Sequence, residues 1–312
     1  MRELADIVHA WQHHRDQPCV LATLVRSQGS SYRRPGARML VCPDETCVGS
    51  LSGGCLEEEV AQRAAEVLRT GQPALMSFDT RRRFGCNGSI EIFVEVVDPA
   101  FLEALSSAFQ QRSTCRAVTI FEGNDEQLGS HTLVSDDLAP QGSFVQELLP
   151  AIHLIIFGEG PDSQPLRSIA QLLGWSVTEV EQAPDLPATA DDRTGVVIKS
   201  HNYGRDCAAL QHFLQLGLRY VGLLGPRKRR DQLLGDLLDH GTAFTAELFA
   251  PAGLDLNAET PEEIALSIAA EIQAVFAQGT GESLRARKAP IHGWNLVLEP
   301  KAQKSACELS AP

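Results

Sequence analysis

The sequence predicts an α/β protein with two domains. A mixed α/β domain is expected over residues 1–140, and a doubly wound domain with a parallel sheet over residues 150–278. Three observations support this prediction. Apolar runs of strand length alternate with amphipathic helical stretches through the second half. Loops that contain glycine or proline punctuate these runs. A polar stretch near residue 140 separates the halves, and 312 residues suffice for two hydrophobic cores.

Composition excludes several classes of function. A formal net charge of −13 argues against general binding to nucleic acid or anionic membranes, although a local basic cluster could still hold one phosphate. No apolar run approaches the ~20 residues of a membrane span, and the charged start of the chain is unlike a signal peptide. Eight cysteines scattered along such a chain favour reduced thiols over a disulfide framework. We therefore expect a cytoplasmic protein.

The first half is predicted to begin with an amphipathic helix over residues 3–15, because Leu4, Ile7, Val8 and Trp11 recur at helical spacing. Short apolar runs then predict strands, and two further helices lie between them. In order, these elements are strand 19–26, a hairpin of 39–42 with 46–51, helix 56–70 ending at Gly71, strands 74–78 and 90–96, helix 99–111, and strands 117–121 and 131–134.

The stretch from Gly49 to Glu57 has the layout of a reactive site. Gly53 and Gly54 deliver Cys55 to the start of the helix 56–70. Glycines let a ligand approach the main chain, and the positive end of a helix lowers the pKa of a thiol. Cys55 is therefore a candidate nucleophile or metal ligand. The alternative is a small buried cysteine in a tight strand-to-helix turn.

Cys86 repeats this pattern in a second loop. It follows a run of arginines and is framed by Gly85 and Gly88. Thiolates from two converging loops are typical of sulfur handling or soft-metal binding, although the same four residues also suit an ordinary tight turn. Cys42 and Cys47 bracket a turn as well. We do not expect a zinc site there, because the two further ligands at short spacing are missing.

Three arginines form a second candidate site. Arg33, Arg34 and Arg38 lie within six residues, in the loop before the predicted hairpin. The guanidinium fork suits a phosphate group, so these side chains could face a phosphorylated ligand. A solvated turn rich in arginine is the alternative.

The second half begins with an apolar strand, 153–157, that runs into Gly158-x-Gly160 and then into a helix. The next strand, 176–180, ends at Glu181, where Rossmann-like folds place an acid on the ribose. The glycine fingerprint is imperfect, because Ser163 replaces the third glycine and Pro161 removes an N–H that could face phosphate. Binding of NAD or NADP is therefore conceivable but disfavoured, and the alternative is a doubly wound domain kept for its shape.

Ser200 and His201 follow the third strand of this half, 195–198, at the edge where ligands collect in parallel sheets. His201 is thus a candidate acid, base or ligand, or else a capping or packing histidine. The remaining expected elements are helix 206–216, strand 220–225, a basic cluster 226–230 at a helix start, helix 261–278, and a polar, partly disordered tail 279–312.

Long ordered motifs in both halves resemble the XdhC/CoxI family of xanthine dehydrogenase accessory factors. In the first half they are Leu21-Ala22-Thr23, Gly29-Ser30-Ser31, Arg34-Pro35-Gly36-Ala37-Arg38-Met39, Gly49-Ser50 and Ser52 to Glu57. In the second half they are Gly158-x-Gly160 with Pro165-Leu166, Ser200-His201, Asp206, Gly222 to Gly225, and Pro251-x-Gly253-Leu254-Asp255 through Thr260 to Ala265. Departures are visible: Asn87 stands where the family usually has glycine, Pro226 where it has serine, and Pro161 and Asp162 where it has smaller residues.

The resemblance implies a homodimeric chaperone rather than a turnover enzyme. Family members bind the molybdenum cofactor (molybdopterin), favour its sulfuration together with a cysteine desulfurase, and deliver it to an apo molybdenum hydroxylase of the xanthine dehydrogenase type. Cys55 and Cys86 would then lie near the molybdenum, with Cys55 as its metal ligand. The residues implied in cofactor binding are Gly53, Gly54, Arg33, Arg34, Arg38, Gly158, Gly160, Glu181, Ser200 and His201.

Two other functions are compatible with the residues. The first is an NAD(P)-dependent oxidoreductase that uses Glu181 for the ribose and His201 for proton transfer. The second is an adaptor that bridges the desulfurase and the hydroxylase without binding cofactor. Under the chaperone hypothesis, Cys55 and His201 should open onto one cavity, within a chain or across a dimer.

Overall fold

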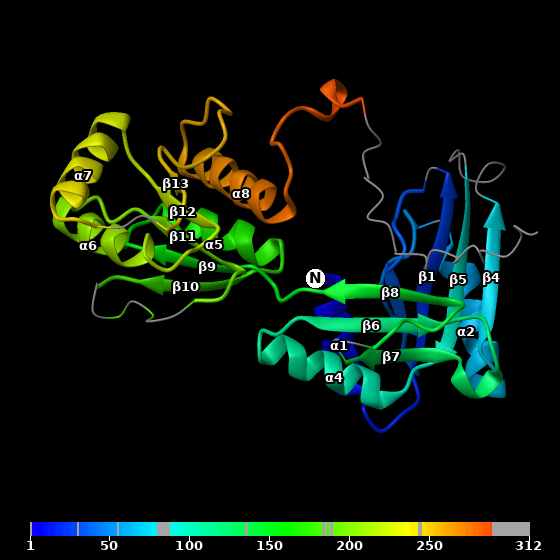
Figure 1. Ribbon diagram of the computed structural model, residues 1–312. Helices are drawn as coiled ribbons and strands as arrows, with labels where there is room; N and C mark the ends of the chain where they lie inside the picture. Colours follow the sequence, from blue (N-terminus) through cyan, green and yellow to red (C-terminus); the bar gives the residue numbers. More distant parts are fainter. Residues whose placement is uncertain are drawn as a thin grey trace, which may run out of the picture.

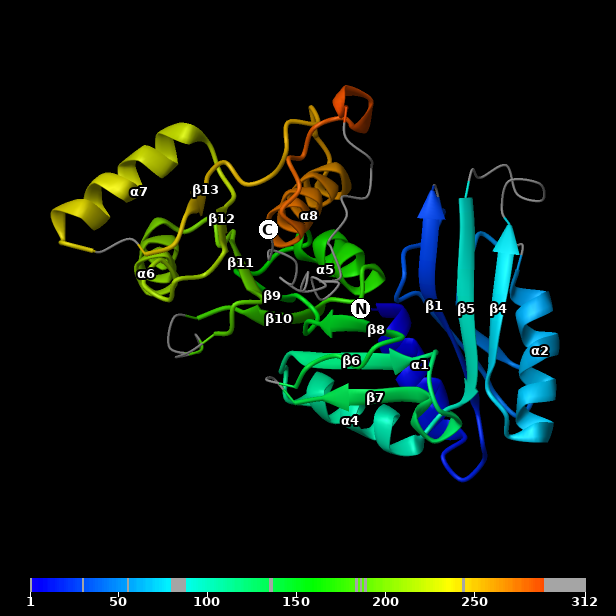
Figure 2. The same ribbon diagram turned by 45° about the vertical axis from the view of Figure 1, so that its right-hand side comes forward.

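The computed structural model describes residues 2–29, 31–54, 56–79, 88–134, 137–182, 185, 187, 190–242 and 245–288. They form a mixed α/β first half and a Rossmann-like second half, as the sequence predicts (Figure 1). In both views a three-stranded sheet lies between the parallel sheet of the second half and the larger antiparallel sheet of the first (Figures 1 and 2). No helix within the described ranges is long and apolar enough to cross a bilayer.

The larger antiparallel sheet has the strand order β3-β2-β1-β5-β4. Alternation along β1 separates two cores: Val20, Ala22 and Leu24 face helix α2, whereas Cys19 and Leu21 face helices α1 and α4. The elements are α1 (Arg2–His13), β1 (Val20–Gly29), β2 (Arg38–Val41), β3 (Cys47–Gly49), α2 (Glu57–Thr70), β4 (Ala74–Asp79), β5 (Gly88–Val96) and α4 (Pro99–Gln110).

The three-stranded sheet has the order β7-β6-β8 and joins the larger sheet through a small aromatic core. Its strands are β6 (Cys115–Ile120), β7 (Gly129–Leu133) and β8 (Ser143–Leu148), with a short 3-10 turn at Asp125–Gln127. Strand β8 lies beyond residue 140, where the sequence placed the end of the first domain, and its antiparallel pairing with β6 puts it in the first half. The change of domain therefore falls after Leu148.

The second half is built on a parallel sheet of order β10-β9-β11-β12-β13. Leu154 and Ile156 on β9 face α5 and α8, while Ile155 and Phe157 face α6 and α7, so each face of the sheet has its own core. The elements are β9 (His153–Phe157), α5 (Ser163–Leu172), β10 (Ser176–Val180), β11 (Thr194–Ile198), α6 (Tyr203–Phe213), β12 (Tyr220–Leu223), α7 (Arg227–Asp239), β13 (Leu248–Phe249), α8 (Pro261–Ala277) and a 3-10 turn Leu284–Ala286.

The first half contacts the amino edge of this parallel sheet. Arg112, just after α4, donates from Nε and Nη2 to the carboxylate of Asp191 at 2.6 and 3.1 Å, and from Nη1 to Ser176 Oγ at 3.4 Å. Arg2 also donates to the carbonyl of Leu172 at the end of α5. Because the five-residue strands run away from this contact for about 16 Å, the carboxyl edge lies at the far end of the sheet.

Candidate functional site

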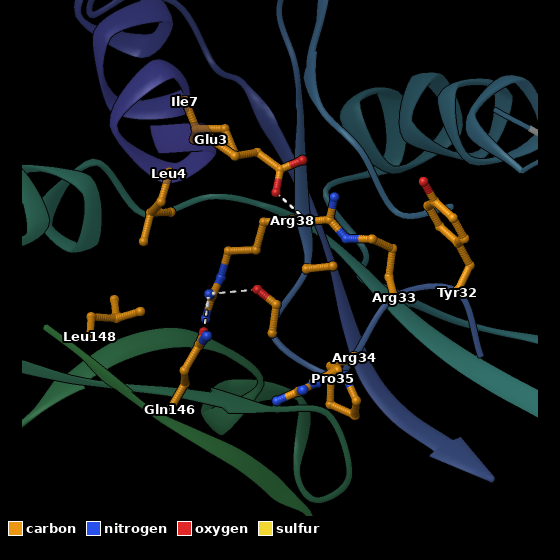
Figure 3. A pocket seen from close by; sticks show the side chains of 12 residues that line it. Glu3, Leu4, Ile7, Tyr32, Arg33, Arg34, Pro35, Arg38, Gln146 and Leu148 are labelled. Carbon is orange, nitrogen blue, oxygen red and sulfur yellow. Dashed lines mark hydrogen bonds and ion pairs between the residues drawn. The ribbon is translucent and has the colours of Figure 1, made fainter. Parts of the chain in front are cut away.

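The arginine loop lines a cavity of about 380 Å³ between α1, the segment 32–38 and β8 (Figure 3). Arg33, Arg34 and Arg38, which the sequence predicts as one candidate site, all contribute to its wall, together with Tyr32. Gly36 turns the chain here with φ +97, and a Cβ at this position would meet the side chain of Gln146 at 2.6 to 2.8 Å. The loop therefore folds tightly onto β8.

Arg38 carries a buried charge at the base of this cavity. Its side chain is 2% exposed, and Nη1 donates to Gln146 Oε1 at 2.5 Å and to the carbonyl of Gly36 at 3.2 Å (Figure 3). Its Nε and Nη2 are buried and find no hydrogen-bond partner among the described residues. A buried guanidinium with two unsatisfied nitrogen donors is costly unless an acceptor reaches it. Arg38 therefore keeps hydrogen-bonding capacity that no described residue uses.

The negative charge that acts on Arg38 is that of Glu95, and burial disfavours this charge as well. Burial lowers the pKa of Arg38 to about 10, against the opposing field of Glu95. Burial likewise raises the pKa of Glu95 to about 7, although Ser130 donates to its carboxylate from the backbone N–H at 2.8 Å and from Oγ at 2.6 Å. Glu95 is thus directed toward Ser130 and makes no ion pair with Arg38 among the described contacts. The guanidinium charge is only partly offset.

The other two arginines differ from Arg38. Arg33 makes an ion pair with Glu3 at the mouth of the cavity (Figure 3). Arg34 is exposed, and its carbonyl accepts from the N–H of Ala37 at 3.2 Å. The charge of Arg33 is thus balanced by an acid of α1. All three arginines thus line one cavity, and the buried nitrogens without a described hydrogen-bond partner belong to Arg38.

The loop before α2 is organised by the carboxylate of Glu57. Its Oε1 accepts from the N–H groups of Leu51 (3.1 Å) and Ser52 (2.8 Å), and from Ser50 Oγ (3.0 Å). Its Oε2 accepts from Ser52 Oγ (2.7 Å) and from the N–H of Leu56 (3.1 Å). Five donors therefore converge on one side chain at the first position of the helix, where negative charge is also favoured by the helix dipole.

These contacts shift the titration of Glu57. Partial burial raises its pKa, but the hydrogen bonds from Ser52 and from backbone N–H groups outweigh burial and lower the pKa to about 2. Glu57 is thus ionised throughout the neutral range. The sequence analysis names Glu57 only as part of a motif and assigns it no role. Its position, as an acid at the start of a predicted helix just after a glycine pair, could have indicated that it organises this loop.

Gly53 and Gly54 lie in this loop, next to the arginine cavity. The ring of Tyr32, which lines the cavity, comes within 4.0 Å of where a Cβ on Gly53 would lie. Gly54 has φ +105, which favours glycine, and a Cβ there would meet no described atom within 4 Å. The described residues thus leave space beside Gly54. Cys55 and Cys86 lie outside the described residues, so their predicted roles stay predictions.

Gly158, Gly160, Ser200 and His201 come together at the carboxyl edge of the parallel sheet. A Cβ on Gly158 would lie 2.6 Å from the backbone of Ser200, so glycine is required for close packing between these two strand ends. Asp206, fully buried, accepts from the N–H and Oγ of Ser200 and from Arg229 Nη2 at 2.6 Å. His201 has φ 55 and a side chain that is 63% exposed.

A lysine and an aspartate, for which the sequence predicts no role, fill the glycine loop at this edge. Lys199 is 2% exposed, and its Nζ donates to Asp162 Oδ1 at 2.9 Å and to the carbonyl of Glu159 at 3.0 Å. Burial raises the pKa of Asp162, but Lys199 outweighs it, so the pKa lies below its ordinary value. The other oxygen of Asp162 lies 3.7 Å from His201 Nε2. The carboxylate is folded over Gly160, where a Cβ would meet it at 2.7 Å.

Glu181 lies just beyond β10, near the same edge. Its side chain is exposed, and its carbonyl accepts from Arg205, which also lies over the ring of Phe157 and pairs with Glu159 at 3.3 Å. The described contacts of Glu181 are thus made by its backbone. Ribose binding by its carboxylate stays a prediction.

The two groups of residues do not share one cavity among the described parts of a single chain. The arginine cavity is lined by residues of the first half, and that half contacts the amino edge of the parallel sheet. His201 lies at the opposite, carboxyl edge. A common cavity across a dimer stays a prediction.

Comparison with known proteins places these features in a family. A model described as the XdhC and CoxI family matches residues 12–79, which include the arginine loop and the Glu57 loop. A model described as the XdhC Rossmann domain matches residues 154–272, which include the parallel sheet. The chain belongs to the XdhC/CoxI family. The resemblance stated from the sequence is therefore confirmed, and so is the fold class.

Individual XdhC relatives match along most of this chain. A protein of Bacillus subtilis (strain 168), named as a probable subunit of xanthine dehydrogenase, is 29% identical over 310 residues, covering 82% of this chain and 92% of that protein. The molybdenum cofactor insertion chaperone PaoD of Escherichia coli (strain K12) is 27% identical over 275 residues, covering 82% and 83%. The crystal structure of a xanthine dehydrogenase from Bacillus halodurans has a TM-score of 0.75 at 26% identity, covering 91% of this chain and 98% of that one.

We predict that Glu57→Gln weakens the hydrogen bonds that hold the loop before α2. A lowered folded-state pKa means that the carboxylate stabilises the loop fully above its ordinary pKa of 4.5, and that this contribution is lost as pH falls through about 2. Removing the charge should lower the hydrogen-exchange protection factors of Leu51, Ser52 and Leu56 at neutral pH by about tenfold or more, because hydrogen bonds to a charged group contribute roughly 1.5–3 kcal/mol. Glu58→Gln, an exposed charge in the same helical turn, is the control. Unchanged protection in Glu57→Gln would contradict the role assigned to this carboxylate.

The second prediction concerns dinucleotides. Because the Asp162 carboxylate lies at the start of α5, where a pyrophosphate would sit, NAD and NADP should show no micromolar binding in calorimetry. Asp162→Asn removes the repelling charge and should increase any weak binding of either dinucleotide. Micromolar affinity for NAD or NADP in the unchanged protein would overturn this prediction.

Proposed function

We propose that this protein is a molybdenum cofactor chaperone that supports maturation of a hydroxylase of the xanthine dehydrogenase type. Membership of the XdhC/CoxI family and likeness to the PaoD chaperone support the general role. The observation that carries cofactor binding is the buried Arg38 guanidinium, with two donors unsatisfied within the described structure, at the wall of a cavity of about 380 Å³. That volume lies within the roughly 300–1,000 Å³ of small-molecule sites.

In this proposal the arginine cavity takes the phosphate end of the cofactor, and the loop that leads into Cys55 takes the metal end. Molybdopterin carries a phosphate, and the unsatisfied N–H groups of Arg38 are donors of the kind that bind phosphate strongly. The loop of Gly53 and Gly54 adjoins the cavity through Tyr32 and leads into Cys55. When bound, the cofactor supplies a molybdenum centre with an exchangeable sulfur ligand. Cys55 would provide a soft thiolate toward that centre, with Cys86 in a supporting role.

Other residues take lesser parts in this proposal. Arg33 and Arg34 would raise the positive potential at the mouth of the cavity, with Arg33 tempered by Glu3. We further propose that the carboxyl edge with Gly158, Gly160, Glu181, Ser200 and His201 serves a partner or a second ligand. A cysteine desulfurase, an apo hydroxylase and a second copy of the chain are the partners proposed, in the cytoplasm. Sulfuration of the cofactor would take place within such an assembly.

The rival functions receive less support. The Asp162 carboxylate at the start of α5 disfavours an oxidoreductase that depends on NAD or NADP. The unsatisfied donors of Arg38 disfavour an adaptor that binds no cofactor, because such a protein gains nothing from this buried charge.

Arg38→Met tests the cofactor site. Replacing a buried, poorly compensated charge with an apolar side chain of similar length should leave the thermal midpoint unchanged or raised. Retained molybdenum in anaerobically purified protein should fall by about tenfold or more, since a hydrogen bond to a charged group contributes roughly 1.5–3 kcal/mol. Loss of the cofactor without loss of thermal stability would show that the charge of Arg38 serves cofactor binding rather than folding.

The matched control for Arg38 is Arg26→Met. Arg26 pairs with Glu91 at 2.7 Å and with Glu122 at 3.0 Å, away from the cavity. Its substitution should not alter the molybdenum content. Equal cofactor retention by Arg38→Met and the unchanged protein would contradict the proposed site.

Cys55→Ser tests the thiol. A hydroxyl with a pKa far above neutrality is neither a soft ligand nor a nucleophile, so cofactor retention or sulfuration should be lost while circular dichroism stays unchanged. Molybdenum content and activation of the apo hydroxylase are the measurements, and Cys115→Ser, a partly buried thiol of the same half, is the control. Stoichiometric retention together with full activation by Cys55→Ser would refute the role of this residue.

A further inference from the structure

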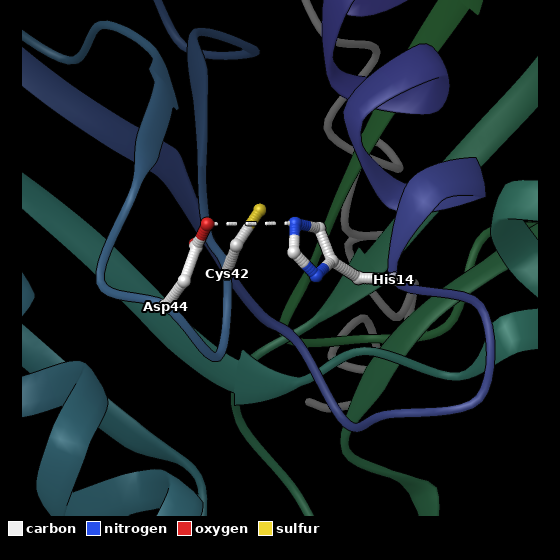
Figure 4. Close-up of side chains that lie close together, drawn as sticks. All are labelled: His14, Cys42 and Asp44. Carbon is white, nitrogen blue, oxygen red and sulfur yellow. Dashed lines mark ion pairs between the residues drawn. The ribbon is translucent and has the colours of Figure 1, made fainter.

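Three potential metal ligands from separate segments of the first half converge outside the arginine cavity. His14 follows α1, Cys42 follows β2, and Asp44 lies in the turn before β3 (Figure 4). One ligand atom from each, an imidazole nitrogen, the thiol sulfur and a carboxylate oxygen, all lie within 4.8 Å of one another. None of the three lines the cavity that contains Arg38.

The three side chains form a small site that is open on one side. Cys42 is 4% exposed and lies at its base. The side chains of His14 and Asp44 are 25% and 55% exposed, and His14 Nε2 lies 3.8 Å from Asp44 Oδ2 (Figure 4). Two of the ligands can therefore rotate toward an ion that enters from solvent, while the third is fixed.

The backbone around these residues is held by local hydrogen bonds. The N–H of Cys42 donates to the carbonyl of Thr46 at 2.9 Å, and the N–H of Thr46 donates to Asp44 Oδ1 at 3.1 Å. The N–H of His14 donates to the carbonyl of Trp11 at 2.9 Å, and Trp11 is a core residue. The second carboxylate oxygen of Asp44, Oδ2, faces His14. The positions of the ligands thus rest on the turn and on the end of a packed helix.

A second thiol lies beside Cys42. The register Val20 to Val41 between β1 and β2 places Cys19 directly opposite Cys42, and the two thiols share a hydrogen bond. Burial, followed by the field of Cys19, raises the pKa of Cys42 to about 12, so the sulfur is protonated when no cation is near. Cys19 lies outside the set of three atoms that are within 4.8 Å of one another. It neighbours the site and orients the Cys42 thiol.

We propose that His14, Cys42 and Asp44 bind one Zn²⁺ ion, with the fourth position open to solvent or to an added ligand. One sulfur, one nitrogen and one oxygen ligand suit Zn²⁺, whose bonds of roughly 2.0–2.3 Å require the exposed side chains to close by about 1 Å. On binding, the Cys42 thiol releases its proton to solvent and its sulfur forms the metal bond. A set with a single sulfur is unsuited to an iron–sulfur cluster, and a buried thiol is unsuited to Mg²⁺ or Ca²⁺.

The site revises the conclusion drawn from spacing about Cys42 and Cys47. From the spacing, Cys42 and Cys47 have no further metal ligands close to them in the sequence, so no zinc site is expected there. In the structure Cys47 is exposed and its thiol is directed to the carbonyl of Glu45 at 3.8 Å, whereas Cys42 faces His14, 28 positions earlier in the chain. The third ligand, Asp44, is two residues from Cys42.

Metal titration of the full-length, reduced protein tests this proposal. Zn²⁺ added in competition with a chromophoric chelator should bind at one ion per chain through this site. Co²⁺ used as a spectroscopic substitute should give a thiolate-to-metal charge-transfer band that Cys42→Ser abolishes. His14→Ala at a partly exposed position and Asp44→Asn at an exposed one should each weaken Zn²⁺ binding on the order of 10- to 100-fold, the range seen when even an outer partner of a metal ligand is lost.

His13→Ala and Cys207→Ser are matched controls, because His13 lies next to His14 in the chain and Cys207 is a partly exposed thiol of the second half. Neither should change the affinity for Zn²⁺. The proposal is overturned if the chain binds no Zn²⁺, if His14→Ala and Asp44→Asn bind it as tightly as the unchanged protein, or if the Co²⁺ band survives in a folded Cys42→Ser variant. The last result would assign the ion to other thiols.

Discussion

The first half depends on how it accommodates a charge buried between its two antiparallel sheets. Arg38 projects from β2 of the larger sheet and reaches Gln146 on β8 of the smaller one. Glu95 on β5 reaches the other way, to Ser130 on β7. These polar contacts join the two sheets beside the small aromatic core that also lies between them. They also leave two nitrogens of the Arg38 guanidinium without a described acceptor, and the proposed anion site depends on these nitrogens.

The glycine loops of the two halves share one feature. Each precedes a helix, and each is contacted by a carboxylate of its own chain: Glu57, the first residue of α2, and Asp162, just before α5. Helix starts and glycine loops commonly bind external anions. Glu57 takes backbone N–H donors of its loop, whereas Asp162 pairs with Lys199 and adds negative charge near the start of α5. Among the described residues, buried guanidinium nitrogens without a hydrogen-bond partner are found at Arg38, where there are two, and at Arg205 and Arg229, where there is one each. Of these three arginines, Arg38 alone lines the cavity of the first half, and the proposed phosphate site rests on it.

The periodicity of apolar residues in the sequence correctly predicted two kinds of element: an amphipathic helix, and strands that are buried on both faces of the sheet. Helix α1 and the apolar strands β9, β11 and β12 lie close to where they were expected. Strand β8 was missed because its residues are mixed in polarity and its pairing with β6 depends on a distant part of the chain. The burial of Arg38 could not be read from a loop of three arginines, because only the packing of β8 encloses it. Likewise, the approach of His14 to Cys42 depends on the packing of α1 against β2.

The contact between the halves also limits how their activities can be linked. Arg112 and Arg2 join the first half to the amino edge of the parallel sheet, so a molecule seated at the carboxyl edge does not cover the arginine cavity. The arginine cavity and the carboxyl edge are thus formed by different residues at separate places of one chain. Among the described residues, the halves are joined by the Arg112 ion pair, by the contact of Arg2 with the end of α5, and by the short connection between Leu148 and His153, so this junction is where binding at one end would alter binding at the other.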